Sequence, residues 1–338
     1  MATISDVAKL SGLSVATVSR VINNKPHVSQ KKRDAVLAAM DQLGYVPLQA
    51  ARQMRGSGSG NIAVAIPGIK NNFFAHLVDA IEKTCRSAGY RSLISQTQGT
   101  EEGEMDALDL LKMQHADGLI LCSLENKWET ITSYAKYGAL AICDEYTASN
   151  ELSKVIGRQY DGFYGATQYL IARGYKKIAY CTGFTGLKVM PKGSDLDSDR
   201  YTGYADALKS RGLEANPNWY FEGVNTLEDG RNVFRRILSL PERPDAIIAG
   251  SDEVAVGIEL EAMHCRFSVP DELAIFGVDD QPIAGIAPVP ISTIRQPIEE
   301  MGTLVAQEIV RQLSLDDDEP LEPVKHELNL DLIIRSST

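Results

Sequence analysis

The chain has 338 residues, of which 44% are hydrophobic and 23% charged, with a formal net charge of −11. This length and composition exclude one small domain and a disordered chain, and predict two or three domains with sizeable cores. Residues 1–60 hold eight lysines and arginines against three aspartates, a net charge of +5, which leaves −16 for the remainder. Such a basic head could bind nucleic acid through phosphate contacts, whereas the acidic body has no such attraction.

Residues 3–29 predict a helix-turn-helix. Ser5 is placed to cap a first short helix, Gly12-Leu13 to form the turn, and Ser14 to cap a second helix. The second helix has an apolar face that should pack, formed by Val18, Val21 and Ile22. Its opposite face is small, polar and cationic, with Ala16, Ser19, Arg20 and Asn23. A face without acidic residues suits a groove lined by phosphates; an ordinary helical hairpin with a solvated face is the alternative.

A third helix should complete the head. Ser29 can cap it, and it should run through Gln42. Its expected apolar stripe consists of Ala35, Val36, Ala39, Met40 and Leu43. Residues 48–55 have helix-forming composition but are too few for a stable isolated helix, and residues 56–60 are a glycine-serine linker.

The segment SDVAKLSGLSVATVSRVINNKPHVS, followed by GYVPLQAARQMRG, resembles the headpiece and hinge of LacI/GalR-type bacterial repressors. The resemblance rests on DVA, LSVATVSRVIN, HVS and the GY-x-P ahead of an AR pair. It implies that two hinge helices, one per subunit, enter the minor groove, with Met54 as the apolar wedge in place of the family's usual leucine; an exposed linker residue is the alternative. The candidate DNA-contacting residues are Thr3, Ser5, Ser14, Val15, Ala16, Thr17, Ser19, Arg20, Asn23, His27, Tyr45, Ala51 and Met54.

Within this set, Val15 and Ala16 are expected to touch base edges and methyl groups in the major groove. Thr17, Ser19 and Arg20 would add polar or phosphate contacts. Two equivalent heads require a near-palindromic operator, so double-stranded DNA and a second copy of the chain are the expected partners. The sequence ends at Thr338 without leucine heptads for a tetramer-forming tail, so a homodimer is expected.

From residue 61 onward, apolar strands alternate with helical stretches, which predicts parallel sheets covered on both faces. The expected strands are NIAVAIP, RSLISQ, DGLILCS, GALAICD, KKIAYCTG, DAIIAGS and ELAIFGV. The expected helices lie near 74–89, 102–115, 126–137, 161–174, 199–212, 227–239 and 252–265. A return crossover and final long helix from IPISTIRQPIEEMGTLVAQEIVRQL, and a closing strand from LNLDLIIRSST, resemble the same family.

The expected fold class is therefore α/β: a three-helix helix-turn-helix headpiece with a hinge helix, then the two Rossmann-like subdomains of type I periplasmic binding proteins that the resemblance implies. The expected boundaries are 1–46 for the headpiece, 47–60 for the hinge and linker, and 61–338 for the effector-binding and dimerisation core. Within the core, the N-subdomain is expected at about 61–160 and 292–322 and the C-subdomain at about 161–291 and 323–338, with crossovers near 160, 291 and 323.

Ligands of such sheets bind at the carboxyl ends of the strands. The resemblance implies that Arg200, in R-x-x-GY-x-x-AL, and Asp279, in the G-x-DD strand end, hold the effector. The candidate effector-binding residues are Asn72, Phe73, Asp144, Arg200, Asn225, Ser251 and Asp279. Each strand-end aspartate could instead cap a helix, as expected for Asp252, and Phe73 could belong to the core.

The effector is expected to be a sugar, a sugar phosphate or a sugar acid. The family often places a stacking aromatic residue where this chain has Asn225, which argues against a planar-ring effector. The polar stretch 183–199 is expected to form one wall of the site, and its Lys188 and Lys192 could meet a phosphate or carboxylate, or could simply be solvated.

We find no motif for a phosphate loop, a nucleophile elbow or a zinc protease, and residues 56–60 lack GxGxxG spacing. The histidines are isolated, no cysteines form CxxC, and the DDDE run at 316–319 is expected to be a solvated loop, so no metal and no cofactor are expected. The sequence contains neither a signal peptide nor an apolar run long enough to span a bilayer, which predicts a cytoplasmic protein without membrane contact.

The sequence predicts a dimeric transcriptional repressor of carbohydrate-metabolism genes, controlled by a small molecule in the cleft. A corepressor protein is a further candidate partner. Two alternatives stay open: a cytoplasmic small-molecule receptor that acts through a protein partner, and a sugar-modifying enzyme on a Rossmann-like scaffold. Salt-dependent, palindrome-specific DNA binding would separate the repressor from the receptor, and turnover of a bound sugar would support the enzyme.

Overall fold

The computed structural model describes residues 2–22, 26, 28–45, 58–146, 149–186, 189–190, 193–315 and 320–338. The chain divides into two compact units, Met1–Ser59 and Gly60–Thr338. Several predictions fall outside the described residues: those for Asn23, His27, Ala51, Met54, Lys188 and Lys192, for the hinge helix, and for the acidic run 316–319. Among the described helices, none is both long and apolar enough to cross a bilayer.

The first unit holds three helices: α1 (Ile4–Ser11), α2 (Val15–Ile22) and α3 (Gln30–Leu43). Their shared core consists of Val7, Ala8, Val18, Val21, Val36 and Ala39. The predicted apolar face of α2 is confirmed, because Val18 and Val21 are buried and Ile22 packs against the same core. Leu13 also packs there, so the turn between α1 and α2 is held from inside the core.

Three details of the prediction for these helices are wrong, two at helix ends and one within α3. Thr3, not Ser5, caps α1: its hydroxyl accepts from the Asp6 backbone N–H, and the Asp6 carboxylate accepts from the Thr3 N–H, a reciprocal box that Ser5 has no acidic partner to form. Ser29 precedes α3 in extended conformation, but its side chain makes no cap hydrogen bond. Ala35 is exposed, because the contacts of α3 with the other two helices centre on Val36 and Ala39.

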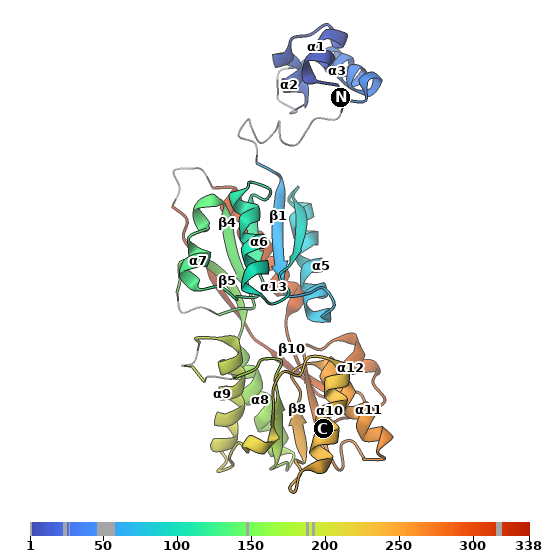
Figure 1. Ribbon diagram of the computed structural model, residues 1–338, viewed down its shortest axis with the longest axis vertical. Coiled ribbons are helices and arrows are strands. Elements are labelled where there is room, and N and C mark those ends of the chain that lie inside the picture. The colour runs from blue at the N-terminus through green and yellow to red at the C-terminus, as the bar shows by residue number, and fades with distance from the viewer. Residues whose placement is uncertain are drawn as a thin grey trace. The chain divides into compact units, whose positions relative to one another are not determined.

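The second unit contains two six-stranded sheets. The first sheet has the order β11-β5-β4-β3-β1-β2 and is entirely parallel. Its strands are β1 (Asn61–Ile66), β2 (Arg91–Gln96), β3 (Gly118–Leu121), β4 (Ala139–Cys143), β5 (Ser153–Gly157) and β11 (Lys325–Leu328). One face packs against α5 (Asn72–Ser87) and α13 (Ile298–Leu313), and the other against α6 (Glu101–Lys112) and α7 (Trp128–Thr132), which is followed by the short 3₁₀ helix Ala135–Tyr137. We call this sheet and its helices the N-subdomain (Figure 1).

The second sheet has the order β12-β10-β9-β8-β6-β7, parallel except that β12 runs antiparallel to β10. Its strands are β6 (Ile178–Cys181), β7 (Tyr220–Phe221), β8 (Ala246–Ile248), β9 (Ala274–Val278), β10 (Ser292–Arg295) and β12 (Asp331–Ile333). The helices α8 (Gln159–Ala172) and α9 (Leu196–Lys209) cover one face. The other is covered by α10 (Leu227–Ser239), α11 (Asp252–His264) and the short α12 (Pro282–Ile286), while a 3₁₀ turn, Pro217–Trp219, precedes β7. We call this group the C-subdomain (Figure 1).

The predicted α/β class with two parallel sheets is confirmed, but two crossover positions were wrong. The chain passes between the sheets after β5, after β10 and again between β11 and β12. The second and third crossovers therefore follow residues 295 and 328 instead of 291 and 323. Both strands are short and lack a long apolar run: β10 pairs with β9, and β11 pairs with β5, which lies far away in sequence.

Candidate functional site

A cavity of about 870 Å³ opens at the carboxyl ends of strands from both sheets. Its walls include the segments that follow β1, β3 and β4 in the N-subdomain and those that follow β6, β8 and β9 in the C-subdomain. Parallel strands bring their carboxyl ends to the same edge of a sheet, so two facing sheets can enclose a ligand there. The principal polar lining residues are Asn71, Ser123, Glu125, Asp144, Glu145, Thr185, Asp195, Asp197, Arg200, Asn225, Ser251, Asp279 and Gln296.

The structure brings most of the predicted effector residues to this cavity. The ones that line it are Phe73, Asp144, Arg200, Asn225, Ser251 and Asp279. Asn72 is not among the lining residues; its neighbour Asn71 is, and the Asn71 side chain caps α5 by accepting from the Phe73 N–H at 2.9 Å. Phe73 lines the cavity and also belongs to the N-subdomain core, where its side chain is 5% exposed.

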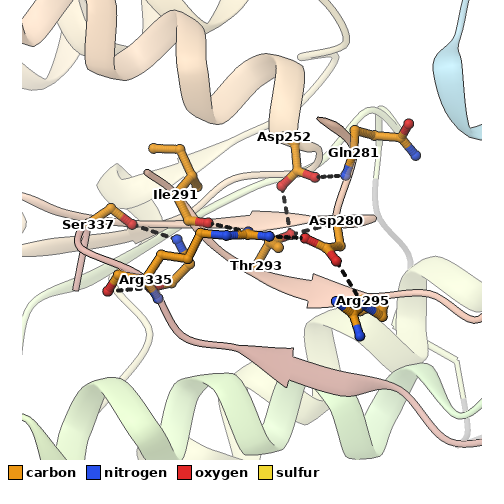
Figure 2. A network of polar contacts seen from close by, with 9 residues as sticks. Asp252, Asp280, Gln281, Ile291, Thr293, Arg295, Arg335 and Ser337 are labelled. Atoms are coloured by element: carbon orange, nitrogen blue, oxygen red, sulfur yellow. Dashed lines mark hydrogen bonds and ion pairs between the residues drawn. The ribbon is translucent and has the colours of Figure 1, made fainter. Parts of the chain in front are cut away.

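Ser251, not Asp252, caps α11, although Ser251 also lines the cavity as predicted. The Ser251 Oγ accepts from the Val254 N–H at 3.3 Å. Asp252 is fully buried and accepts from the Gln281 N–H and the Thr293 hydroxyl, both at 2.6 Å. Figure 2 shows the Asp252 carboxylate between these two donors, so Asp252 ties α11 to β10 instead of capping a helix.

The paired aspartates after β9 point to different partners. Asp280 accepts from Arg295 Nε at 2.7 Å and from Arg335 Nη2 at 2.5 Å, and lies between the two arginines in Figure 2. Both aspartates have left-handed backbone, with φ of 97° at Asp279 and 55° at Asp280, a conformation that ordinary residues adopt only when surrounding contacts hold them there. The anchored Asp280 fixes this turn, and Asp279 is left to line the cavity.

A chain of side-chain hydrogen bonds crosses the base of the cavity at the crossovers between the subdomains. Arg200 Nε donates to Gln159 Oε1 at 2.9 Å, and Gln159 Nε2 donates to Gln296 Oε1 at 2.8 Å. Longer contacts of 3.4 Å run from Gln159 Nε2 to Asp144 and from Gln296 Nε2 to Asp279. Residues of both subdomains thus share one polar network.

The cavity is acidic. Burial raises the pKa of Asp144 to about 7, partly offset by Arg200 and increased further by Asp279. Burial likewise raises the pKa of Glu145 to about 8, with Asp144 adding repulsion, and that of Asp279 to about 6. The guanidinium of Arg200, which also lies 5.4 Å from the Phe163 ring centroid, lowers all three.

Sequence analysis missed several residues of this site. Glu145 directly follows the predicted Asp144, and Gln159 and Gln296 stand at the crossovers, where a buried amide can bond to both sheets; a polar residue at a crossover is the signal that could have revealed them. The wall predicted from 183–199 is present in its described part, through Phe184, Thr185, Asp195 and Asp197. Asn225 lines the cavity and its Nδ2 donates to the Gly183 carbonyl at 3.2 Å.

The first unit presents a polar and cationic surface along α2. Ser14, Val15, Ala16 and Arg20 are exposed, and Thr17 and Ser19 are partly exposed. Ser14 caps the helix as predicted, with its Oγ 3.2 Å from the Thr17 N–H and 2.9 Å from the Thr17 hydroxyl. The side chains that face away from the core are thus the ones proposed for DNA contact.

The other candidates on this unit lie at its edges. Thr3 and Ser5 are exposed at the start of α1, and the hydroxyl of Thr3 is engaged with Asp6 at 2.7 Å. Tyr45 is half-buried and packs against the headpiece core, so its ring supports the fold of this unit.

A helix-turn-helix unit followed by two parallel sheets with a polar cavity at their strand ends defines a ligand-binding DNA-binding regulator. Residues 3–48 match the lacI family of bacterial regulatory proteins, and residues 167–338 match the periplasmic binding protein-like domain. The chain belongs to the lacI family and is a transcriptional regulator, not an enzyme.

Relatives resemble the chain over most or all of its length. The NTD biosynthesis operon regulator NtdR of Bacillus subtilis is 36% identical over 338 residues, which is 100% of both chains. The ribose operon repressor of Escherichia coli is 30% identical and covers 93% of this chain and 94% of its own length. The crystal structure of a LacI family regulator from Lactobacillus casei with bound glucose is 30% identical, with a TM-score of 0.73, over 82% of this chain and 99% of that one.

Proposed function

We propose that the protein is a dimeric repressor of carbohydrate-metabolism genes, acting in the cytoplasm on a near-palindromic operator and controlled by a sugar or sugar derivative in the cavity. One combination of observations carries this proposal. A single chain holds an α2 surface with exposed Val15, Ala16 and Arg20 and a polar cavity lined by Arg200 and Asp279.

The DNA-binding half of the proposal rests on the chemistry of α2. Small apolar side chains such as those of Val15 and Ala16 can approach base edges and thymine methyl groups, while a cation such as Arg20 can contact phosphate or guanine. Thr17 and Ser19 add hydroxyl groups beside them. A homodimer would place two such helices on two half-sites about one helical turn apart or a multiple of it.

The effector half rests on the cavity and on the relatives. The relatives include a ribose operon repressor and a regulator with bound glucose or sucrose. Hydroxyl groups of a sugar would bond to Arg200, Asp144 and Asp279, and the ring would pack on Phe73 and Phe184. Because the lining comes from both subdomains, a bound ligand would stabilise one relative orientation of the two subdomains over another. Operator binding that favours one of these orientations would then become stronger or weaker when the ligand binds.

In vitro selection tests the DNA-binding half. Full-length protein is used to enrich duplexes from a random pool, and the mass of the complex with the enriched duplex is measured. We expect a near-palindromic consensus, two chains per duplex, and an affinity that falls steeply with salt. Enrichment of no common sequence, or a complex with one chain per duplex, would overturn this half of the proposal.

A thermal-shift screen tests the effector half. Neutral sugars, amino sugars, sugar phosphates and sugar acids are added to the full-length protein, and the rise in unfolding midpoint is recorded. A ligand of the cavity should stabilise the wild type and lose most of its effect in Asp279→Asn. A ligand that stabilises both proteins equally binds elsewhere and contradicts the proposed site.

A further inference from the structure

Among the described residues, the lining of the cavity holds more carboxyl groups than cationic groups. Its carboxylates are Glu125, Asp144, Glu145, Asp195, Asp197 and Asp279. Among the lining residues that the structure describes, the only lysine or arginine is Arg200. Even after Asp195 is assigned to capping α9, where it accepts from the Ser198 N–H at 2.8 Å, the remaining carboxylates outnumber the cation.

The single positive charge of Arg200 cannot neutralise all of these carboxyl groups. Its guanidinium is engaged with Gln159 and lies over Phe163, and its one positive charge is shared among several carboxylates. It lowers the pKa of Asp144, Glu145, Asp197 and Asp279 together, yet the pKa of each of the four stays above its ordinary value because burial outweighs it. The cavity therefore favours an additional cation.

The position of the excess charge is also defined. Asp144 and Glu145 are consecutive residues after β4, and repulsion between them contributes to the raised pKa of Glu145. Among the described residues, Asp144 receives one side-chain contact, at 3.4 Å from Gln159, whereas Asp197 is bonded to the Thr182 hydroxyl at 2.9 Å. The Asp144–Glu145 pair is thus the less compensated end of the cavity.

The rest of the lining suits a hydroxylated molecule. Ser123 is 7% exposed, lines the cavity, and its hydroxyl has no hydrogen-bond partner among the described residues. Phe73, Phe74 and Phe184 provide apolar walls against which the C–H face of a sugar ring can pack. A volume of about 870 Å³ accommodates a ligand of the size of a mono- or disaccharide.

We propose that the effector is a polyhydroxylated cation, namely an amino sugar with a free amine, and that Asp144 and Glu145 receive its ammonium group. This inference rests on the proposed function, since it names the chemical class of the ligand that the regulator senses. A sugar phosphate or sugar acid would bring further negative charge against the same carboxylates, and a neutral sugar would leave them uncompensated.

Two matched sets of probes test the charge preference directly, whichever amino sugar is the natural ligand. Tris and pentaerythritol differ in one group, an ammonium against a hydroxymethyl, and glucosamine is compared with both glucose and N-acetylglucosamine. Binding to the full-length protein is measured by thermal shift and calorimetry in a buffer without amines, with tetramethylammonium chloride as the ionic control. We expect each primary amine to bind about tenfold more tightly than its neutral counterpart, the gain typical of a charge-assisted hydrogen bond.

Variants locate the effect. Glu145→Gln should reduce the preference for the amine severalfold, whereas Glu214→Gln, the same change at an exposed position outside the lining, should leave it intact. Equal binding of amine and neutral probes, stronger binding of glucose 6-phosphate or gluconate, or no binding of either amine at 100 mM would overturn the inference. If Glu145→Gln fails to fold, the comparison of amine and neutral probes on the wild-type protein still tests the inference.

Operator binding by the same preparation separates this inference from the proposed function. A protein that binds its selected duplex but shows no preference for amines refutes only the amino-sugar assignment. A protein that binds no specific duplex refutes the proposed repressor, whatever the result with the probes.

Discussion

Arg200 Nε donates to Gln159 Oε1 at 2.9 Å, and this bond joins the cavity wall to the first residue of the helix that begins the C-subdomain. Gln159 is fully buried, and its amide nitrogen also contacts Gln296, which follows β10 at the second crossover. One side chain therefore orients the cavity's described cation and bonds across two of the three chain crossovers. A ligand that contacts Arg200 acts on a group tied directly to the segments about which the subdomains would move.

Gln159→Ala should lower the stability of the protein and weaken ligand binding in the cavity. Removing the amide leaves Arg200 and Gln296 without their partner, and losing a buried hydrogen bond of this kind costs about 1–3 kcal/mol. We expect a lower unfolding midpoint and about tenfold weaker binding of any sugar that stabilises the wild type. Gln168→Ala is the control: Gln168 joins α8 to α9 away from the cavity, with Nε2 2.6 Å from Ser210 Oγ, so it should affect stability but not sugar affinity.

Arg20→Ala should reduce operator affinity at every salt concentration, and the logarithmic salt slope should become shallower by about one if Arg20 contacts a phosphate. Fluorescence anisotropy with the selected duplex measures both quantities. Lys209→Ala, which removes the same charge from the last turn of α9, should change neither. An Arg20→Ala protein with wild-type affinity and slope would exclude Arg20 from the DNA contact.

Asp279→Asn should abolish the response to the effector while operator binding without effector is retained. The substitution keeps the shape of the side chain but removes the charge that faces the cavity. Its neighbour Asp280, which bonds to Arg295 and Arg335, still anchors the turn. A normal effector response in Asp279→Asn would remove this residue from the binding site.

The stability of the protein should depend on pH through Asp144 and Glu145. Their pKa values are raised by burial to about 7 and about 8, so between the ordinary carboxyl pKa and these values the folded chain binds protons more tightly than the unfolded chain. Their contribution to stability is therefore greatest at acidic pH and is lost as the pH rises through about 7 to 8.

Asp144→Asn accordingly should raise the unfolding midpoint by about 2–4 °C at about pH 8.5 and by much less at about pH 5. Scanning calorimetry at the two pH values measures the difference. Asp106→Asn, at an exposed position on α6, is the matched control and should show no such dependence. A loss of stability at the higher pH would contradict the account of an uncompensated carboxylate.

The sequence was a good guide where apolar periodicity is strong. The strands NIAVAIP and ELAIFGV and the apolar face of α2 were all predicted, because burial on both faces of a sheet or on one face of a helix leaves a clear pattern. The strand β5 was missed because SKVIG carries a lysine. Lys154 is nevertheless buried, and its ammonium group donates to the Ser149 carbonyl at 2.9 Å.

For the site, strand-end position and family resemblance located the carboxylates and Arg200, but not the network that holds them. Gln159 and Gln296 are 137 residues apart in sequence and meet only because both lie at crossovers. The mistaken roles of Ser5 and Asp252 have a similar origin. Whether a polar side chain caps a helix depends on which donors and acceptors surround it, and those partners come from the tertiary fold.

The most direct test of ligand-controlled DNA binding is the affinity for the selected duplex with and without the sugar that most raises the unfolding midpoint. We predict that a saturating concentration of this sugar changes the operator dissociation constant of the wild type by at least about fivefold, and leaves that of Asp279→Asn unchanged. A sugar that occupies the cavity of the wild type, as judged by calorimetry, without any change in operator affinity would contradict the account.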